Sequence, residues 1–126
     1  MAKQKGNYVD GFVLAIPKKN LAAYKAMAII GKKVWMKHGA LDYKECIIDD
    51  PKPMGVTLTF GKLIKPSAGE IVAFSYIVYK SRAHRDMVNK KVMKDSMMNA
   101  DKWKDKPMPF DMKRMAVGGF KVIVSA

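Results

Sequence analysis

The stretch that decides the fold is EIVAFSYIVYKSRAHRDMVNKKVMKD, residues 70–95. Its first part, residues 70–79, is rich in β-branched and aromatic residues and is apolar at both odd and even positions, which indicates a strand inside a sheet. Ser81 then offers an N-cap hydroxyl, and apolar residues recur at helical spacing as far as Val92. The segment therefore predicts a strand followed by a helix that ends near Asp95.

The rest of the chain also alternates between predicted strands and predicted helices. Pro17 suits a helix entry, and the apolar stripe that follows it ends at Gly39, a natural C-terminal stop. Residues 51–69 show no clear period and predict a long irregular excursion with a short helix or strand. Three further segments carry the residues typical of strands: 8–16, 40–48 and 114–124. The order β-α-β-loop-β-α-β predicts an α+β, ferredoxin-like βαββαβ fold with an antiparallel sheet.

The composition agrees with one folded domain. The chain has 126 residues, of which 49% are hydrophobic and 28% are charged, values that exclude a membrane protein and a disordered chain. We expect a single domain over residues 1–126, with a flexible tail over residues 1–7. No signal peptide or membrane anchor is recognised, and Cys46 stands alone, so the predicted location is the reducing cytoplasm. Cys46 is interpreted as a small buried strand residue rather than a thiol nucleophile.

A sheet of this kind has a covering problem. Two helices can cover only one face of four strands, while the strand 70–79 is apolar on both faces. A bare apolar face of that size usually marks an interface. We therefore predict a homodimer formed through the sheet face, with two-fold symmetry.

The charge is strongly positive and uneven. Lys and Arg total 24 against 11 Asp and Glu, which gives +13, and the middle of the chain, residues 38–79, is close to neutral. Such a field attracts polyanions. A nucleic-acid module would use lysines on the predicted helices and their entries: Lys18, Lys19, Lys32, Lys33, Lys90, Lys91 and Lys94. A solvated lysine surface is favoured, because arginines, which suit phosphate and base recognition, number only three.

Familiar catalytic motifs are absent, and the candidates are single residues. His38 and His84 both lie on the apolar side of their predicted helices, where an imidazole serves as a general base, binds a ligand or bonds to a core neighbour. Two histidines exclude a three-histidine metal centre, and no spacing predicts another metal site or a cofactor. A cluster of methionines is interpreted as adaptable core filler rather than a metal or binding surface: Met93, Met97, Met98, Met108, Met112 and Met115.

Two carboxylates alternate with apolar residues on predicted strands. Asp10 lies between Tyr8 and Phe12, and Glu45 follows Tyr43 by two residues. Buried carboxylates are costly unless paired. They are interpreted either as an acid–base pair in an internal cavity or, the favoured alternative, as partners of basic side chains such as Arg114.

Four segments resemble the YbaA-like family, a bacterial domain of unknown function: YVDGFVLAIP (8–17), WMKHGALDYKEC (35–46), FSYIVYKSRAHRDMVNKKVMKD (74–95) and MPFDMKRMAVGGF (108–120). The resemblance implies a ferredoxin-like fold of the dimeric α/β-barrel group, whose members bind small molecules between the sheet and its helices. No catalytic motif of that group can be carried over. The residues that match the family's motifs are Asp10, His38, Glu45, Ser75, Arg82, His84, Arg85, Asp86, Asn89 and Arg114.

Three functions remain open on this evidence. The first is a dimeric α/β-barrel enzyme or binder of a small molecule, with Asp10, His38, Glu45 and His84 as catalytic candidates. Its candidates for ligand binding are Ser75, Arg82 and Arg114. The second is a structural or interaction protein without a ligand, and the third, less favoured, is a basic nucleic-acid-binding module.

Overall fold

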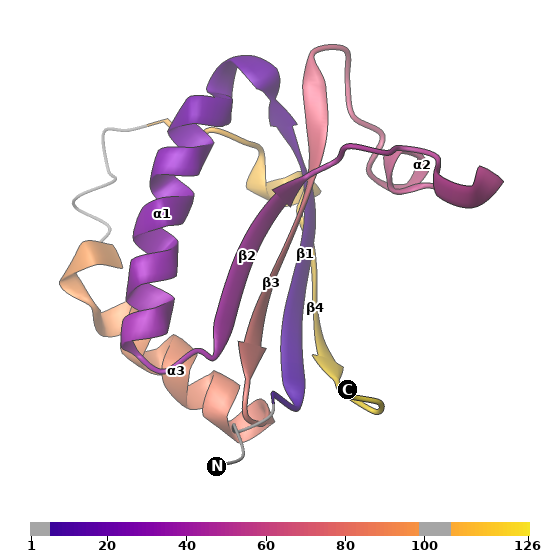
Figure 1. The fold of residues 1–126 in the computed structure, drawn as a ribbon. Coiled ribbons are helices and arrows are strands. Elements are labelled where there is room, and N and C mark those ends of the chain that lie inside the picture. Colours follow the sequence, from indigo (N-terminus) through magenta and orange to yellow (C-terminus); the bar gives the residue numbers. More distant parts are fainter. Residues whose placement is uncertain (1–5, 99–106) are drawn as a thin grey trace.

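Four strands form one antiparallel sheet in the order β2-β3-β1-β4 in a computed structural model, which describes residues 6–98 and 107–126 (Figure 1). The strands are β1 (Tyr8–Pro17), β2 (Asp42–Ile47), β3 (Glu70–Tyr79) and β4 (Ala116–Lys121), and the helices are α1 (Leu21–Lys37), α2 (Phe60–Ile64) and α3 (Arg82–Lys94). Short 3-10 turns cover Lys18–Asn20, Pro53–Gly55, Ser96–Met98 and Met112–Arg114. Helices α1 and α3 lie on one side of the sheet (Figure 1), which confirms the predicted α+β, ferredoxin-like fold.

The deciding segment folds as its pattern predicts. Strand β3 spans the predicted residues, and α3 begins after Ser81, whose Oγ accepts a hydrogen bond from the backbone N–H of His84 at 3.1 Å. Asp95 is the C-cap of α3. The side-chain cap satisfies an N–H group that the first helical turn cannot pair internally.

The irregular excursion contains a short helix, α2, which is one of the two elements predicted for it, and the turn Pro53–Gly55. The last strand is shorter than predicted, because Lys121 pairs with Tyr8, the first residue of β1, and little of β1 remains to pair beyond it. Of the predicted tail, residues 1–5 lie outside the described residues, and the Asn7 N–H donates to the Tyr79 carbonyl at 3.0 Å. The predicted loop over 96–112 begins with a 3-10 turn, and residues 99–106 of it also lie outside the description.

The core lies between the helices and one face of the sheet. Alternate residues of β1 and β3 point to this helix side, and they meet buried residues of α1 and α3. One cluster is centred on Tyr79, Val88 and Val92, and a second on Leu14 and Ile16. All five side chains are almost completely buried, so the two clusters anchor the helices to the sheet.

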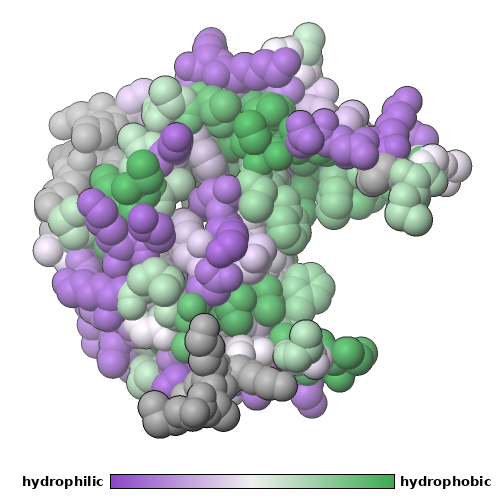
Figure 2. Space-filling view, in the orientation of Figure 1, coloured by the Kyte–Doolittle hydropathy of each residue, from purple (hydrophilic) through white to green (hydrophobic). Residues whose placement is uncertain are grey.

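The other face of the sheet is not covered by α1 or α3, and we call it the open face. Of the described helices, the short helix α2 reaches it, where the Phe60 ring lies 6.2 Å from the Phe74 ring. The side chains of the open face belong to the intervening strand positions: Val9, Val13, Phe74, Tyr76, Val78 and Phe120. Phe74 is 41% exposed and Phe120 is 60% exposed. Figure 2 shows this side as a recess with apolar atoms along its wall, flanked by the α2 region and by the C-terminal end of the chain.

Cys46 also lies on the open face, where it is opposite Phe74. Its side chain is exposed, so the expectation of a buried cysteine is wrong. The reason is its position on β2, an edge strand, on the face of the sheet opposite α1 and α3.

Candidate functional site

A pocket of about 610 Å³ lies between α1 and the helix side of the sheet, and we call it the α1 pocket. Its wall is mostly apolar and draws on β1, α1, β2, β3 and the residues before β4. Its lining consists of Phe12, Leu14, Tyr24, Met27, Ala28, Ile30, Gly31, Trp35, Tyr43, Glu45, Ser75, Ile77, Met98, Met108, Phe110, Met112 and Met115. Four of the six methionines interpreted as core filler line this space.

Glu45 is the charged residue of the lining, and two tyrosines hold it. Because Tyr43 and Glu45 are two residues apart on β2, both point to the helix side. The Tyr43 hydroxyl donates to Glu45 Oε1 at 2.8 Å, and the hydroxyl of Tyr24, from α1, donates to Glu45 Oε2 at 2.6 Å. Burial, reinforced by the Glu45 carboxylate, raises the pKa of both tyrosines above its ordinary value. Both phenols are therefore neutral donors that orient the carboxylate.

Ser75 lies directly opposite Glu45 on the neighbouring strand β3. The residue is only 6% exposed, and its hydroxyl makes no hydrogen bond to any described residue. Among the described residues, Arg85 Nε is the buried side-chain atom that lacks a hydrogen-bond partner, so the Ser75 oxygen is not sealed off and is accessible from the pocket that it lines. Ser75 and Glu45 thus place two polar groups side by side on one wall of an apolar pocket.

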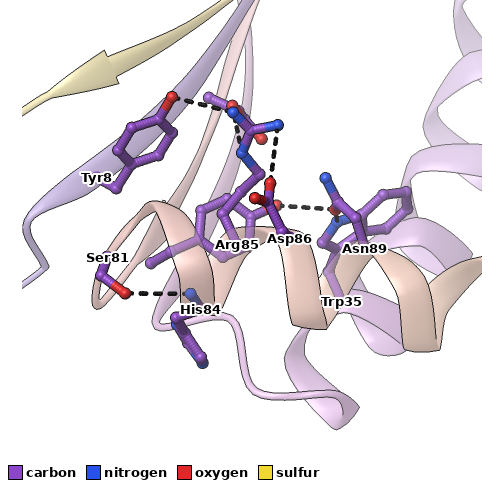
Figure 3. A network of polar contacts seen from close by, with 9 residues as sticks. Tyr8, Trp35, Ser81, His84, Arg85, Asp86 and Asn89 are labelled. Atoms are coloured by element: carbon purple, nitrogen blue, oxygen red, sulfur yellow. Dashed lines mark hydrogen bonds and ion pairs between the residues drawn. The ribbon is translucent and has the colours of Figure 1, made fainter.

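Trp35 closes another part of the wall, and α3 fixes its ring (Figure 3). The Trp35 Nε1–H donates to Asn89 Oδ1 at 3.0 Å, and the Tyr79 hydroxyl donates to the same oxygen at 3.3 Å. The Trp35 ring lies 6.3 Å from the Tyr43 ring, centroid to centroid. Helix α3 therefore positions the aromatic wall from behind.

Asp10, a predicted catalytic candidate, lies outside the pocket in a second polar cluster. Its carboxylate is buried, and its Oδ1 is 3.7 Å from Arg85 Nε. Arg85 also donates through Nη2 to the Tyr8 hydroxyl at 3.0 Å and lies 3.5 Å from Asp86 (Figure 3). Burial raises the pKa of Asp10 although Arg85 opposes the shift. The suggested partner Arg114 instead binds Glu70 at 2.8 Å, so the pairing of Asp10 is with α3.

The two histidines also lie outside the pocket. His38 Nε2 is 2.7 Å from Asp95 Oδ2, and Lys37 Nζ binds the same oxygen at 3.1 Å. The backbone N–H of Met97, together with His38 and Lys37, holds the pKa of the Asp95 carboxyl well below its usual range. This cluster ties the end of α1 to the end of α3.

His84 caps the turn between β3 and α3. Its Nδ1 accepts a hydrogen bond from the Lys80 backbone N–H at 2.9 Å. Burial, with Lys80 and Lys91 nearby, lowers the pKa of His84. Arg82 is exposed on the first turn of α3. Of the seven predicted site residues, the structure therefore brings only Glu45 and Ser75 together at the pocket.

Sequence reasoning missed the groups that hold Glu45. The spacing of Tyr43 and Glu45 on a strand was the available signal for one of them, whereas Tyr24 reaches Glu45 from another element.

Within residues 6–98 and 107–126, no three His, Cys, Asp or Glu side chains gather as a metal site would require. No described helix is both long and apolar enough to cross a bilayer. The seven lysines considered for nucleic acid are all exposed.

The fold and the site define an α+β, ferredoxin-like domain with a pocket beneath α1 and an open sheet face that neither α1 nor α3 covers. A crystal structure described as a dimeric ferredoxin-like protein from an uncultured marine organism is similar to it, with a TM-score of 0.53 and 11% identity over 95% of this chain and 99% of that chain.

The chain belongs to the family described as Protein of unknown function (DUF1428), whose model matches residues 7–112. The chain is 41% identical over 117 residues to the Uncharacterized protein YbaA of Escherichia coli K12, covering 93% of this chain and 97% of that protein. The YbaA protein of Shigella flexneri matches to the same extent. The resemblance to the YbaA-like family is thus confirmed, and the family has no assigned activity.

Proposed function

We propose that this protein is a homodimer that binds a small, largely apolar molecule in the α1 pocket of each copy. The observation that carries the proposal is the pocket itself. Its volume of about 610 Å³ lies in the range typical of ligand sites, which combine an apolar wall with a few polar groups. Glu45 and Ser75 are those groups here.

The pocket is a cleft that reaches solvent at the exposed residue Glu45, and most of its wall is apolar. Methionines such as Met27, Met112 and Met115 are unbranched and adaptable, so they suit a wall that closes around a guest molecule. A bound apolar molecule would remove this apolar wall from water, which is favourable.

Methyl NMR of the methionines tests the binding. The probe is 4-phenyl-1-butanol, added to protein labelled at the methionine methyl groups. We expect shifts at Met27, Met112 and Met115 and none at Met54, which is 99% exposed and lies outside the pocket. Shifts confined to exposed methionines would overturn the proposal.

A matched pair of variants on α1 sharpens this test. Ala28→Phe puts a ring into the pocket, whereas Ala26→Phe adds the same ring at an exposed position of the same helix. We expect the first variant to abolish the shifts and the second to preserve them. Equal binding by both variants would contradict the location.

The open face supports the homodimer. Its exposed aromatic residues, Phe74 on β3 and Phe120 on β4, lie on the two strands that flank β1, and monomers rarely leave such a patch in water. The similar solved structure is described as dimeric. A second copy related by a two-fold axis presents the same patch and covers both.

Light scattering tests the assembly. We expect a mass of twice the 14.1 kDa chain. Phe74→Asp places a charge on the open face and should give monomers, whereas Met93→Asp, at an exposed position on α3, should remain dimeric. A wild-type mass of one chain would refute the homodimer.

A further inference from the structure

We infer that the α1 pocket selects amphipathic amines, whose protonated nitrogen binds Glu45 and Ser75 while the apolar body fills the pocket. This inference rests on the proposed function, since it names the ligand class of the same site. Four observations support it: the charge of the lining, the geometry of Glu45, the neighbouring Ser75 hydroxyl and the aromatic wall.

The pocket lining carries a negative charge, whereas the chain as a whole is strongly positive. The protein carries 24 basic and 11 acidic residues, yet Glu45 is the charged side chain among the described residues that line the pocket. Lysine, arginine and histidine are all missing from that lining. An anionic head group would meet a carboxylate and no cation, whereas an ammonium would meet its counter-charge.

The geometry of Glu45 leaves its carboxylate able to accept further hydrogen bonds. Each carboxylate oxygen takes one tyrosine hydroxyl, at 2.8 Å from Tyr43 and 2.6 Å from Tyr24. An ionised carboxylate offers about four lone-pair directions, so about half of them remain for a ligand. Glu45 is itself exposed, which places its charge at the mouth of the pocket. The two phenols fix its direction without neutralising it.

Ser75 provides the second contact point. It is directly opposite Glu45 on β3, and side chains at such positions lie about 5 Å apart. One ammonium, with three N–H groups, can therefore reach the carboxylate and the Ser75 hydroxyl together. That contact would give the Ser75 hydroxyl the hydrogen bond that it lacks among the described residues.

The aromatic wall suits the same head group. The Tyr43 ring, whose hydroxyl donates to Glu45, lies 6.3 Å from the Trp35 ring, centroid to centroid, with the two planes tilted by 42°. Aromatic faces attract cations, with tryptophan the strongest. The deeper wall, which includes Phe12, Met27 and Ile30, accepts hydrocarbon.

Three probes with one apolar body test the inference: 4-phenylbutylamine, 4-phenyl-1-butanol and 4-phenylbutyrate. Isothermal titration calorimetry at neutral pH and fixed ionic strength gives their affinities for the full chain. We expect the amine to bind about tenfold more tightly than the alcohol, and the carboxylate to bind most weakly, because only the amine gains a charge-assisted hydrogen bond.

Variants then assign the preference. In Glu45→Gln the ratio of amine to alcohol affinity should fall to about one, because the counter-charge is gone. Asp49→Asn makes the same change in net charge at an exposed residue outside the lining, so it should keep the wild-type ratio. Ser75→Ala should lower the amine affinity by a smaller factor than Glu45→Gln.

The outcomes separate the two proposals. Alcohol binding in the pocket with no preference for the amine overturns the inference and leaves the binding function standing. A preference that survives Glu45→Gln also overturns it. Failure of all three probes to shift the pocket methionines overturns both.

Discussion

Gly31→Ala is the substitution that most directly tests how α1 and β2 build the site. Gly31 is buried on the sheet side of α1, and a Cβ added there would lie 2.9 Å from the Tyr43 hydroxyl oxygen and 3.8 Å from the Trp35 ring. The first distance is shorter than a relaxed contact. The Tyr43 hydroxyl must therefore move, and with it the donor that holds Glu45 Oε1.

Two effects of similar size oppose each other. Replacing glycine by alanine inside a helix stabilises the fold by about 1 kcal/mol. Losing the hydrogen bond from Tyr43 to Glu45 costs about 0.5–1.5 kcal/mol, at the modest end for a charged acceptor because Glu45 is exposed. The net change in the free energy of unfolding should then be close to zero, within about 1 kcal/mol. Amine affinity should nevertheless fall severalfold, since Glu45 loses one of its two orienting donors.

Urea denaturation and calorimetric titration measure the two quantities. Gly61→Ala is the control for stability, because a Cβ there meets only Thr59 Oγ1 at 3.7 Å, an ordinary contact. A second background isolates the cause: in Tyr43→Phe, the hydroxyl that the new methyl group meets is absent. There Gly31→Ala should show its full helical gain, and the difference between backgrounds is the coupling energy. Equal gains in both backgrounds, with unchanged amine affinity, would refute this account of Gly31.

Three further predictions concern the scaffold. The folded pKa of Asp95 lies below its ordinary value of 3.8, so its contribution to stability is present at neutral pH and is lost as the pH falls below about 4. Thermal melts of Asp95→Asn should therefore show a lower Tm than wild type at pH 7. The Tm of this variant should also fall less steeply than that of wild type as the pH is lowered below about 4. Ser81→Ala removes the N-cap of α3 and should lower the free energy of unfolding by about 1 kcal/mol in urea titrations, an effect that Ser81→Asp should largely avoid. Val88→Ala empties a fully buried position and should cost about 1–3 kcal/mol, whereas Met93→Ala on the outer side of α3 should cost far less.

Local patterns carried most of the fold. The bounds of β3 and the start of α3 follow from an unbroken β-former run and one N-cap serine, and both are properties of adjacent residues. Helix α2 could not be predicted definitely, because its five residues make less than two helical turns and are too few to show a helical period. The end of β4 was set by the start of β1, a distant partner that no local pattern reports.

The site was less accessible to sequence reasoning for a related reason. Asp10 and Glu45 have the same alternating apolar neighbours, yet Asp10 meets Arg85 and Glu45 meets Tyr24 and Tyr43. The two carboxylates differ in the helix that lies above their strands. The placement of each helix depends on strand order and on contacts between residues far apart in the sequence, which no local pattern reports.

The side chains of β3 point alternately to the α1 pocket and to the open face, so this strand contributes both to ligand binding and to the proposed dimer. Ser75 points into the α1 pocket, while its neighbours Phe74 and Tyr76 point to the open face. If a second copy covers the open face, β3 is buried on both sides, which accounts for a run of residues that is apolar at odd and even positions alike. The two surfaces are therefore adjacent in sequence but separated by the thickness of the sheet. Phe74→Asp should accordingly abolish dimerisation while the pocket still prefers the amine, and loss of that preference in a folded monomer would mean that the partner copy helps to shape the pocket.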